Sequence, residues 1–173
     1  PRSRVSPLGA VPKPDGSVRL ILDLSSPRGA SINEGILQSD FACTYSSFDD
    51  AVDVVRGLGT ACYMGKLDVQ HAFRLCPVRP DQWHLLVYRW GGFYFVDTRL
   101  PFGGRSSPFI FNVLADLLCW IFSTVGGIAF VLHYLDDYFT ANKTEEACAR
   151  DMRVVQRLCV ELGVPLASDK VVG

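Results

Sequence analysis

Two aspartates, Asp136 and Asp137, stand side by side in the largely apolar segment IAFVLHYLDDYFTAN, residues 128–142. An isolated Asp-Asp pair most often belongs to a turn, because short acidic side chains hydrogen-bond their own backbone. A two-residue hairpin turn favours Asn-Gly or Asp-Gly, however, and Tyr-Leu-Asp-Asp-Tyr contains no glycine. We therefore predict a hairpin whose two acids serve chemistry rather than ease of turning.

The chemistry that suits these acids is metal binding. Two carboxylates about 4 Å apart repel each other by about 1 kcal/mol in water and about 4 kcal/mol at an effective dielectric constant near 20, so a cluster of acids needs a cation. Mg²⁺ takes oxygen ligands and usually binds through one or two carboxylates plus substrate phosphates. A third acid, Asp68, follows a predicted strand in KLDVQHAFRL. Asp68 and Asp136 are candidates to hold two metal ions around a phosphoryl centre, although spacing alone leaves open whether they meet.

The rest of the chain supplies the elements that must position these acids. Turn residues between β-rich runs predict hairpins, and capping residues before apolar periodic runs predict helices. The predicted hairpins are residues 9–24, 84–100 and 128–142, the helices 46–59, 106–122 and 144–163, and the other strands 61–69 and a short one from Val164, with 25–45 irregular. This order predicts an α+β domain with a mainly antiparallel sheet and helices on one face.

The longest apolar tract, residues 108–122, contains Asn112 and Asp116 and is too short to span a bilayer. We predict a largely buried helix with a serine cap and with Pro108 at its first position, and no membrane partner.

Composition sets broad limits on the class of protein. The chain of 173 residues is 49% hydrophobic, which predicts one well-buried domain, or one domain with a small lobe. A net charge of −1 gives no overall basic field for nucleic acid, although a local basic groove can coexist with an acidic metal site. The spacing of the six cysteines and three histidines predicts reduced core cysteines in an intracellular protein, without assigning cytoplasm or nucleus, and no zinc site. A chain that runs from Pro1 to Gly173 is interpreted as a piece of a longer polypeptide.

Four segments, in this order, resemble the motifs of the reverse transcriptase family, the RNA-dependent DNA polymerases of retroelements. KLDVQHAFRL is similar to the motif with the first catalytic aspartate and an aromatic residue five positions on, and LPFGGRSSPFIFN to the motif that shapes the nucleotide and template site. YLDD matches the tyrosine-x-aspartate-aspartate box, and ELGVPLASDK resembles the leucine-glycine…lysine motif. Ahead of them, VPKPDGSVRLILDL resembles the fingers hairpin. The amino-acid sequence of these segments is most similar to that of retrotransposons of the tyrosine-recombinase (DIRS-like) kind.

The resemblance implies the right-hand polymerase fold, with palm and fingers present and the thumb absent. Within a single reverse transcriptase domain over residues 1–173, it implies fingers over about 1–35 and 76–106 and a palm over about 36–75 and 107–173. The two acids of YLDD would form a hairpin tip in the palm beside Asp68.

The resemblance also implies catalytic roles. Asp68 and Asp136 would be the principal metal ligands, Asp137 an auxiliary one and Val69 a further one, for two Mg²⁺ ions that Mn²⁺ can replace. The 3′-hydroxyl of the primer would attack the α-phosphate of the nucleotide, and pyrophosphate would leave. Lys170, an ordinary surface lysine on pattern alone, would protonate that pyrophosphate.

Nucleotide-binding roles follow from the same motifs. Lys13 and Arg19, otherwise two solvated charges, would clamp the triphosphate, and the fork of Arg19 suits phosphate oxygens better. Phe73, by default a core residue, would be the steric gate that excludes the ribose 2′-hydroxyl. The other residues that the resemblance places at the nucleotide are His71, where many relatives have an acid, Ala72, Phe102, where retroviral relatives have glutamine, and Gly103.

Template and primer contacts are implied at Ser107, Pro108, Tyr134 and Leu135, of which the first two also start a helix. The resemblance thus implies an RNA-directed DNA polymerase that acts on a primer–template and deoxynucleoside triphosphates. It also implies that thumb, ribonuclease H and recombinase or integrase regions belong to the parent polyprotein, so this piece alone would be weakly active or inactive. The alternatives are a catalytically inactive palm relic that binds RNA or protein as a scaffold, and a two-metal nuclease. The nuclease does not explain Phe73 or the hairpin with Lys13 and Arg19.

Overall fold

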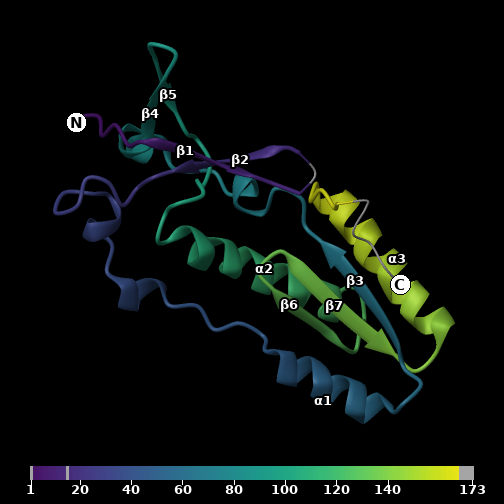
Figure 1. Cartoon of the computed structure of the whole chain (residues 1–173). Helices are drawn as coiled ribbons and strands as arrows, with labels where there is room; N and C mark the ends of the chain where they lie inside the picture. Colours follow the sequence, from purple (N-terminus) through teal and green to yellow (C-terminus); the bar gives the residue numbers. More distant parts are fainter. Residues whose placement is uncertain (1, 15, 168–173) are drawn as a thin grey trace. The chain divides into compact units, whose positions relative to one another are not determined.

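The computed structural model describes residues 2–14 and 16–167 (Figure 1). Over these residues the strands are β1 (Leu8–Pro12), β2 (Val18–Leu22), β3 (Tyr63–Asp68), β4 (Val87–Trp90), β5 (Phe93–Val96), β6 (Val131–Tyr134) and β7 (Asp137–Asn142). The α-helices are α1 (Phe48–Leu58), α2 (Ser107–Thr124) and α3 (Glu145–Leu162), and short 3-10 helices are η1 (Asn33–Gly35), η2 (Gln38–Phe41), η3 (Ala72–Leu75) and η4 (Pro80–Leu85).

The chain divides into two compact units, Pro1–Cys43 with Phe73–Phe111 and Thr44–Ala72 with Asn112–Gly173. The first unit contains two antiparallel hairpins, β1–β2 and β4–β5, both within the predicted ranges. In the second hairpin Gly91 and Gly92 form the tip with φ of 57° and 87°, a conformation that glycine adopts without strain. The two hairpins meet a small core of Leu22, Leu24 and Leu86 with the half-buried residues Ile32, Val78 and Tyr88 packed against it. The division into fingers and palm at the predicted residues stays a prediction.

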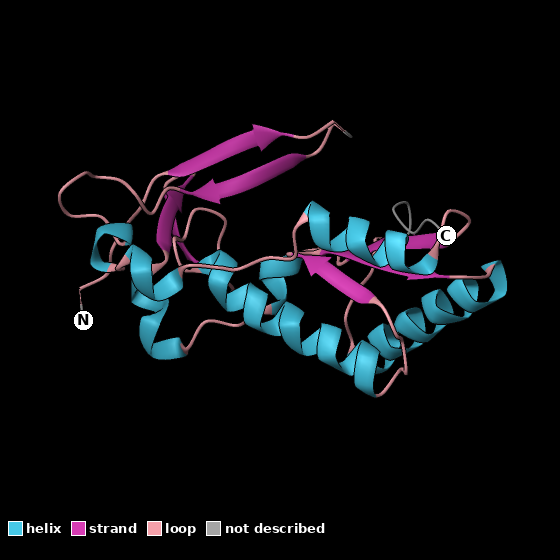
Figure 2. Ribbon diagram, turned by 90° about the horizontal axis from the view of Figure 1, so that it is seen from below, coloured by secondary structure: helices cyan, strands magenta, loops and turns pink. Residues whose placement is uncertain are grey.

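The second unit is a three-stranded antiparallel sheet in the order β3-β7-β6, and its strands lie side by side in Figures 1 and 2. Helix α3 packs on one face, where a side chain on Gly65 would collide with Met152. Helix α2 reaches the sheet through Tyr138, whose hydroxyl donates to the Ala115 carbonyl at 3.3 Å. Side chains of α1 line a pocket with Lys66, which points away from Gly65 because successive residues of a strand face opposite sides.

The predicted helix ends are confirmed for α1 and α3. Ser47 caps α1, where its side chain and Asp50 satisfy each other's backbone N–H groups. Thr144 caps α3, and Gly163 ends it in the left-handed conformation with φ of 69°. The predicted short strand from Val164 reduces, over the residues described, to one bridge between Leu166 and Val69.

Two predictions for α2 are wrong. The helix begins at Ser107, so Pro108 is its second residue, where its missing N–H still costs no helical hydrogen bond. The helix is also not largely buried. One side packs into the core through Phe111, Ala115, Leu118 and Phe122, whereas Ile110, Val113, Leu117 and Trp120 are exposed. With 18 residues α2 is longer than the predicted tract, and by length and apolar composition alone it could cross a membrane, as core helices of soluble proteins also could; it is the one such helix in the part of the chain that the structure describes.

Candidate active site

The three predicted metal-binding aspartates lie at one end of the β3-β7-β6 sheet. Asp68 ends β3 and is buried, Asp137 begins β7, and the two residues are partners in the strand register, so their side chains leave the same face of the sheet. The backbone ties the third acid to them, because the Val69 N–H donates to the Asp136 carbonyl at 2.8 Å. The Ala167 N–H donates to the Asp68 carbonyl at 2.9 Å, which holds the end of β3 from its other side.

The hairpin tip differs by one residue from the prediction. Tyr134 pairs with Asp137, so the two-residue turn consists of Leu135 and Asp136, and Asp137 belongs to the strand. Leu135 has φ of 54°, a conformation that costs a non-glycine residue roughly 1–2 kcal/mol. The chain keeps this strain at the point that presents Asp136, which is the usual setting of a functional constraint. Tyr134 is exposed, and its ring lies 4.9 Å from that of Tyr45.

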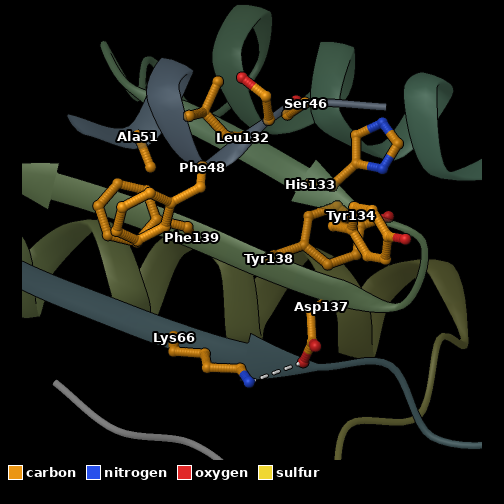
Figure 3. Close-up of a pocket in the computed structure, with 11 residues that line it drawn as sticks. Ser46, Phe48, Ala51, Lys66, Leu132, His133, Tyr134, Asp137, Tyr138 and Phe139 are labelled. Carbon is orange, nitrogen blue, oxygen red and sulfur yellow. Dashed lines mark ion pairs between the residues drawn. The ribbon is translucent and has the colours of Figure 1, made fainter. Parts of the chain in front are cut away.

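Lys66 is a member of this cluster that the sequence reasoning missed. Its ammonium group lies 3.0 Å from an oxygen of Asp137, and the dashed line in Figure 3 marks the pair. Lys66 stands two residues before Asp68, so it shares the face of the acids, and the period of two in KLD was the signal for it. Both side chains are about half exposed, so the pair stabilises the fold by less than about 1 kcal/mol.

The pocket in Figure 3 lies beside this pair and has a volume of about 400 Å³. Phe48 and Ala51 from α1 and Phe139 from β7 form its apolar wall, and Asp137 and Lys66 contribute the charged groups. A charged pair at the edge of an apolar cavity is less screened by solvent than one on an open surface.

The cluster fits a hard divalent cation by ligand type. Three carboxylates at one strand end are the oxygen donors that Mg²⁺ and Mn²⁺ prefer. Lys66 now supplies a counter-charge to one of them, as the mutual repulsion of acids requires. Within residues 2–14 and 16–167, no three His, Cys, Asp or Glu side chains converge closely enough to form a metal site. The backbone thus brings the three aspartates to one end of the sheet. Their side chains do not converge on a common point as the ligands of one metal ion would.

The first unit brings together three of the predicted nucleotide-binding residues. The guanidinium carbon of Arg19 lies 4.9 Å from the centre of the Phe102 ring, a cation–π arrangement. The Phe73 ring lies 5.0 Å from Phe102 and 5.8 Å from Phe111. Arg19 is exposed on β2, and its contact with the Phe102 ring limits the freedom of its guanidinium at the surface.

Gly103 allows the chain to pass close to β2. Its φ of 108° suits glycine, and a Cβ there would collide with the Leu22 carbonyl oxygen. The Leu22 N–H donates to the Phe102 carbonyl at 2.9 Å, which holds the 102–103 segment against the hairpin. This close approach is to β2 of the same chain, and the approach to base and template that the resemblance implies for Gly103 stays a prediction.

Asn33 holds the same segment from the other side, and sequence reasoning missed it. Its amide Nδ2 donates to the Gly103 carbonyl at 2.9 Å, and its Oδ1 accepts from the Arg105 N–H at 2.8 Å. The Asn33 side chain is buried whereas Gly103 and Arg105 are exposed, so these bonds anchor the exposed loop to the interior of the first unit. A polar residue in an irregular segment gives no periodic signal of burial, so the sequence held no clue to it.

The other predicted site residues are less informative. Lys13 is exposed at the end of β1, where its N–H donates to the Ser17 carbonyl at 2.8 Å. His71 is exposed with φ of 62°, and Ala72 is buried at the start of η3. Ser107 is buried and its hydroxyl donates to the Pro101 carbonyl at 2.9 Å, which fixes the start of α2 before Pro108. Lys170 lies outside the described residues.

Burial sets the protonation of the groups behind the acidic cluster. It raises the pKa of the Tyr138 hydroxyl far above its ordinary value, with smaller contributions from neighbouring groups that include Asp136. Tyr138 therefore stays neutral, and its hydroxyl donates a hydrogen bond to the backbone of α2. Burial likewise raises the pKa of the Cys119 thiol to about 11. Both groups act as structural support.

The chain matches known proteins over most of its length. The family model described as "Reverse transcriptase (RNA-dependent DNA polymerase)" matches residues 11–173. The Pro-Pol polyprotein of Simian foamy virus type 1 is 25% identical over 170 residues, which are 95% of this chain and 13% of that protein. The Pro-Pol polyprotein of Simian foamy virus type 3 (strain LK3) is 30% identical over 122 residues, which are 65% of this chain and 9% of that protein.

Solved structures agree on the fold. The native protease–reverse transcriptase of prototype foamy virus matches 96% of this chain and 20% of its own length with a TM-score of 0.70 at 24% identity. The foamy viral protease–reverse transcriptase in complex with an RNA/DNA hybrid matches 99% of this chain and 21% of its own length with a TM-score of 0.72 at 23% identity. At these identities the likeness shows the fold, and it confirms the predicted α+β palm and fingers. The chain spans about an eighth of the first relative and a fifth of these structures.

Proposed function

The chain belongs to the reverse transcriptase (RNA-dependent DNA polymerase) family, and from this premise we propose that it is the fingers and palm of an RNA-directed DNA polymerase. It adds deoxynucleotides to a primer 3′-hydroxyl on an RNA or DNA template. The observation that supports this most is the gathering of Asp68, Asp136 and Asp137 at one end of the sheet, from a strand end and a strained turn. A relic has no physical reason to keep three mutually repelling acids together.

Divalent metal ions are typical of this family, and we assign two Mg²⁺ ions, with Mn²⁺ as a substitute. Asp68 and Asp136 would hold them, with Asp137 and Val69 as further ligands. Bound there, the ions would supply positive charge to the attacking and leaving oxygens of the phosphoryl transfer. In the metal-free protein Lys66 offsets the charge of Asp137. It thereby reduces the repulsion among the acids at this end of the sheet.

The incoming nucleotide is assigned to Arg19 and its neighbours. Arg19, with Lys13, holds the triphosphate, since its guanidinium already rests on Phe102 and needs little ordering to form a forked contact. Phe73, which packs against the same Phe102 ring, blocks the ribose 2′-hydroxyl. The remaining nucleotide contacts in this proposal are His71, Ala72 and Gly103, and Lys170 donates the proton to pyrophosphate.

The primer–template is assigned to Ser107 and Pro108 at the start of α2 and to Tyr134 and Leu135 at the hairpin. Related foamy viral proteins have been solved with double-stranded DNA and with an RNA/DNA hybrid, which makes these duplexes the first partners to test. The parent protein in this proposal is an intracellular retrotransposon polyprotein of the DIRS-like kind, acting in the cytoplasm or nucleus. Its thumb, ribonuclease H and recombinase or integrase regions lie outside these 173 residues.

Primer extension tests the proposal. A polypeptide that continues from these residues through the proposed thumb is given poly(rA)–oligo(dT), dTTP and Mg²⁺, beside Asp136→Asn and the control Asp53→Asn, which alters an exposed acid of α1. We expect incorporation that Asp136→Asn lowers at least 100-fold and Asp53→Asn leaves within about twofold. Duplex binding without incorporation would favour the scaffold alternative instead.

A further inference from the structure

The hairpin β4–β5 carries four aromatic side chains on one of its faces. Tyr88 pairs with Phe95 and Trp90 with Phe93 in the strand register, and residues two apart on a strand share a face. The rings of Tyr88 and Phe95 are stacked, with centres 5.5 Å apart and an angle of 17° between their planes. The result is a row of rings that runs from the base of the hairpin to its tip, here named the aromatic ladder.

The ladder is anchored at one end and open at the other. Tyr88 packs against the core of Leu22, Leu24 and Leu86, so the base of the hairpin is fixed. At the tip Trp90 is 68% exposed and Phe93 70%, and Phe95, which is stacked on Tyr88, is 42% exposed. Aromatic side chains stabilise a fold mainly when they are buried. Because these three rings are largely exposed, they contribute little to the stability of the hairpin. A contiguous exposed apolar surface of this kind marks an interaction site.

Charge points to a polyanion as the occupant. Residues 87–96 contain no acid and one base, Arg89, whose guanidinium lies 5.8 Å from the Tyr94 ring on the opposite face of the hairpin. The nearest carboxylates in the sequence, Asp81 and Asp97, are each paired with an arginine at 2.9 Å and 2.6 Å. The first unit as a whole contains ten Lys and Arg against six Asp and Glu, whereas the rest of the chain contains seven against twelve.

We propose that the aromatic ladder of β4–β5 is a binding platform for single-stranded nucleic acid. Unpaired bases stack on Trp90, Phe93 and Phe95. Arg89, which lies with Tyr94 on the opposite face of the hairpin, contributes longer-range attraction to the phosphates. Every base has a π-face, so such a platform tolerates any sequence. Paired bases in a duplex are stacked on one another and cannot reach the rings, so the platform discriminates single strands from duplexes. This function goes beyond nucleotide addition and does not depend on it.

Fluorescence anisotropy tests the proposal with the 173-residue chain and a fluorescein-labelled dT20, in EDTA so that no polymerisation contributes. We expect Trp90→Ala and Phe93→Ala each to weaken binding roughly 5- to 100-fold, since stacking of one base on one ring has that value. Trp90→Phe retains a ring and should stay within about threefold of the unchanged chain. The matched control is Trp120→Ala, which removes a 57% exposed tryptophan from α2 and should change binding less than twofold.

Two further measurements define the platform. Arg89→Gln should lower the slope of log Kd against log salt concentration by less than about 0.7, the value for one direct phosphate contact on a single strand, because Arg89 lies on the face opposite the ladder. Binding of a blunt 20-base-pair duplex should not change in Trp90→Ala. The proposal is overturned if the chain does not bind dT20, if Trp90→Ala binds it as tightly as the unchanged chain, or if sedimentation shows that the ladder instead joins two copies of the chain.

Discussion

Gly103→Ala should destabilise the protein strongly, because two separate features of the structure oppose a side chain there. The backbone has φ of 108°, which lies outside the left-handed well that other residues tolerate. The new Cβ would also collide with the Leu22 carbonyl oxygen, a backbone atom held in β2. We expect about 1–3 kcal/mol from the backbone conformation and about 1 kcal/mol from the Leu22–Phe102 hydrogen bond that must stretch.

Urea unfolding followed by circular dichroism measures this cost. With a slope near 2 kcal/mol per molar urea, a loss of about 2–4 kcal/mol lowers the midpoint by about 1–2 M. Gly92→Ala is the matched control, since Gly92 has a similar φ of 87° and nothing lies within 4 Å of an added Cβ. Its cost should contain the backbone conformation alone and be smaller by about 1 kcal/mol. Equal costs for both variants would refute the argument that the 102–103 segment is packed tightly against β2.

Three more predictions follow from single observations. Asn33→Ala should cost about 1–3 kcal/mol in urea unfolding, because it removes the two hydrogen bonds that hold the Gly103 carbonyl and the Arg105 N–H; a cost below about 0.5 kcal/mol would show that water replaces the amide. Burial raises the pKa of the Cys119 and Cys159 thiols from 9.0 to about 11, so iodoacetamide at pH 8 should modify both about 100-fold more slowly in folded than in unfolded protein, as read by mass spectrometry. Since the folded state favours the neutral thiols, their contribution to stability is complete below pH 9 and is lost as the pH rises towards 11. A free energy of unfolding that stays constant over that pH range would contradict this. His71→Asn should raise the melting temperature by about 2–3 °C, because asparagine tolerates the φ of 62° better and the exposed histidine gives up no packing; an unchanged or lower value would contradict this.

The elements were predictable where local chemistry defines their ends. Ser47, Thr144 and Gly163 mark helix ends through bonds within a few residues, and Gly91-Gly92 marks a tight turn. The exposed side of α2 was not predictable, because an apolar helix reads as buried on all sides unless its neighbours are known.

The site was predictable residue by residue from motifs, and its connections were not. The register that sets Asp68 opposite Asp137 depends on strand pairing between segments about 70 residues apart, which no local pattern encodes. The turn at Leu135 and Asp136 was displaced by one residue for the same reason. Asn33 shows the limit most clearly, since its partners lie 70 and 72 residues away in the sequence.

Titration with Mn²⁺, followed by electron paramagnetic resonance of the free ion, tests most directly whether the three aspartates form the metal centre of a polymerase. The 173-residue chain should bind Mn²⁺, and Asp68→Asn and Asp136→Asn should each weaken that binding at least tenfold, whereas Asp53→Asn should not change it. Competition by Mg²⁺ should release the bound Mn²⁺, as expected for oxygen ligands. No binding at millimolar Mn²⁺, or binding that Asp68→Asn and Asp136→Asn leave unchanged, would contradict the account.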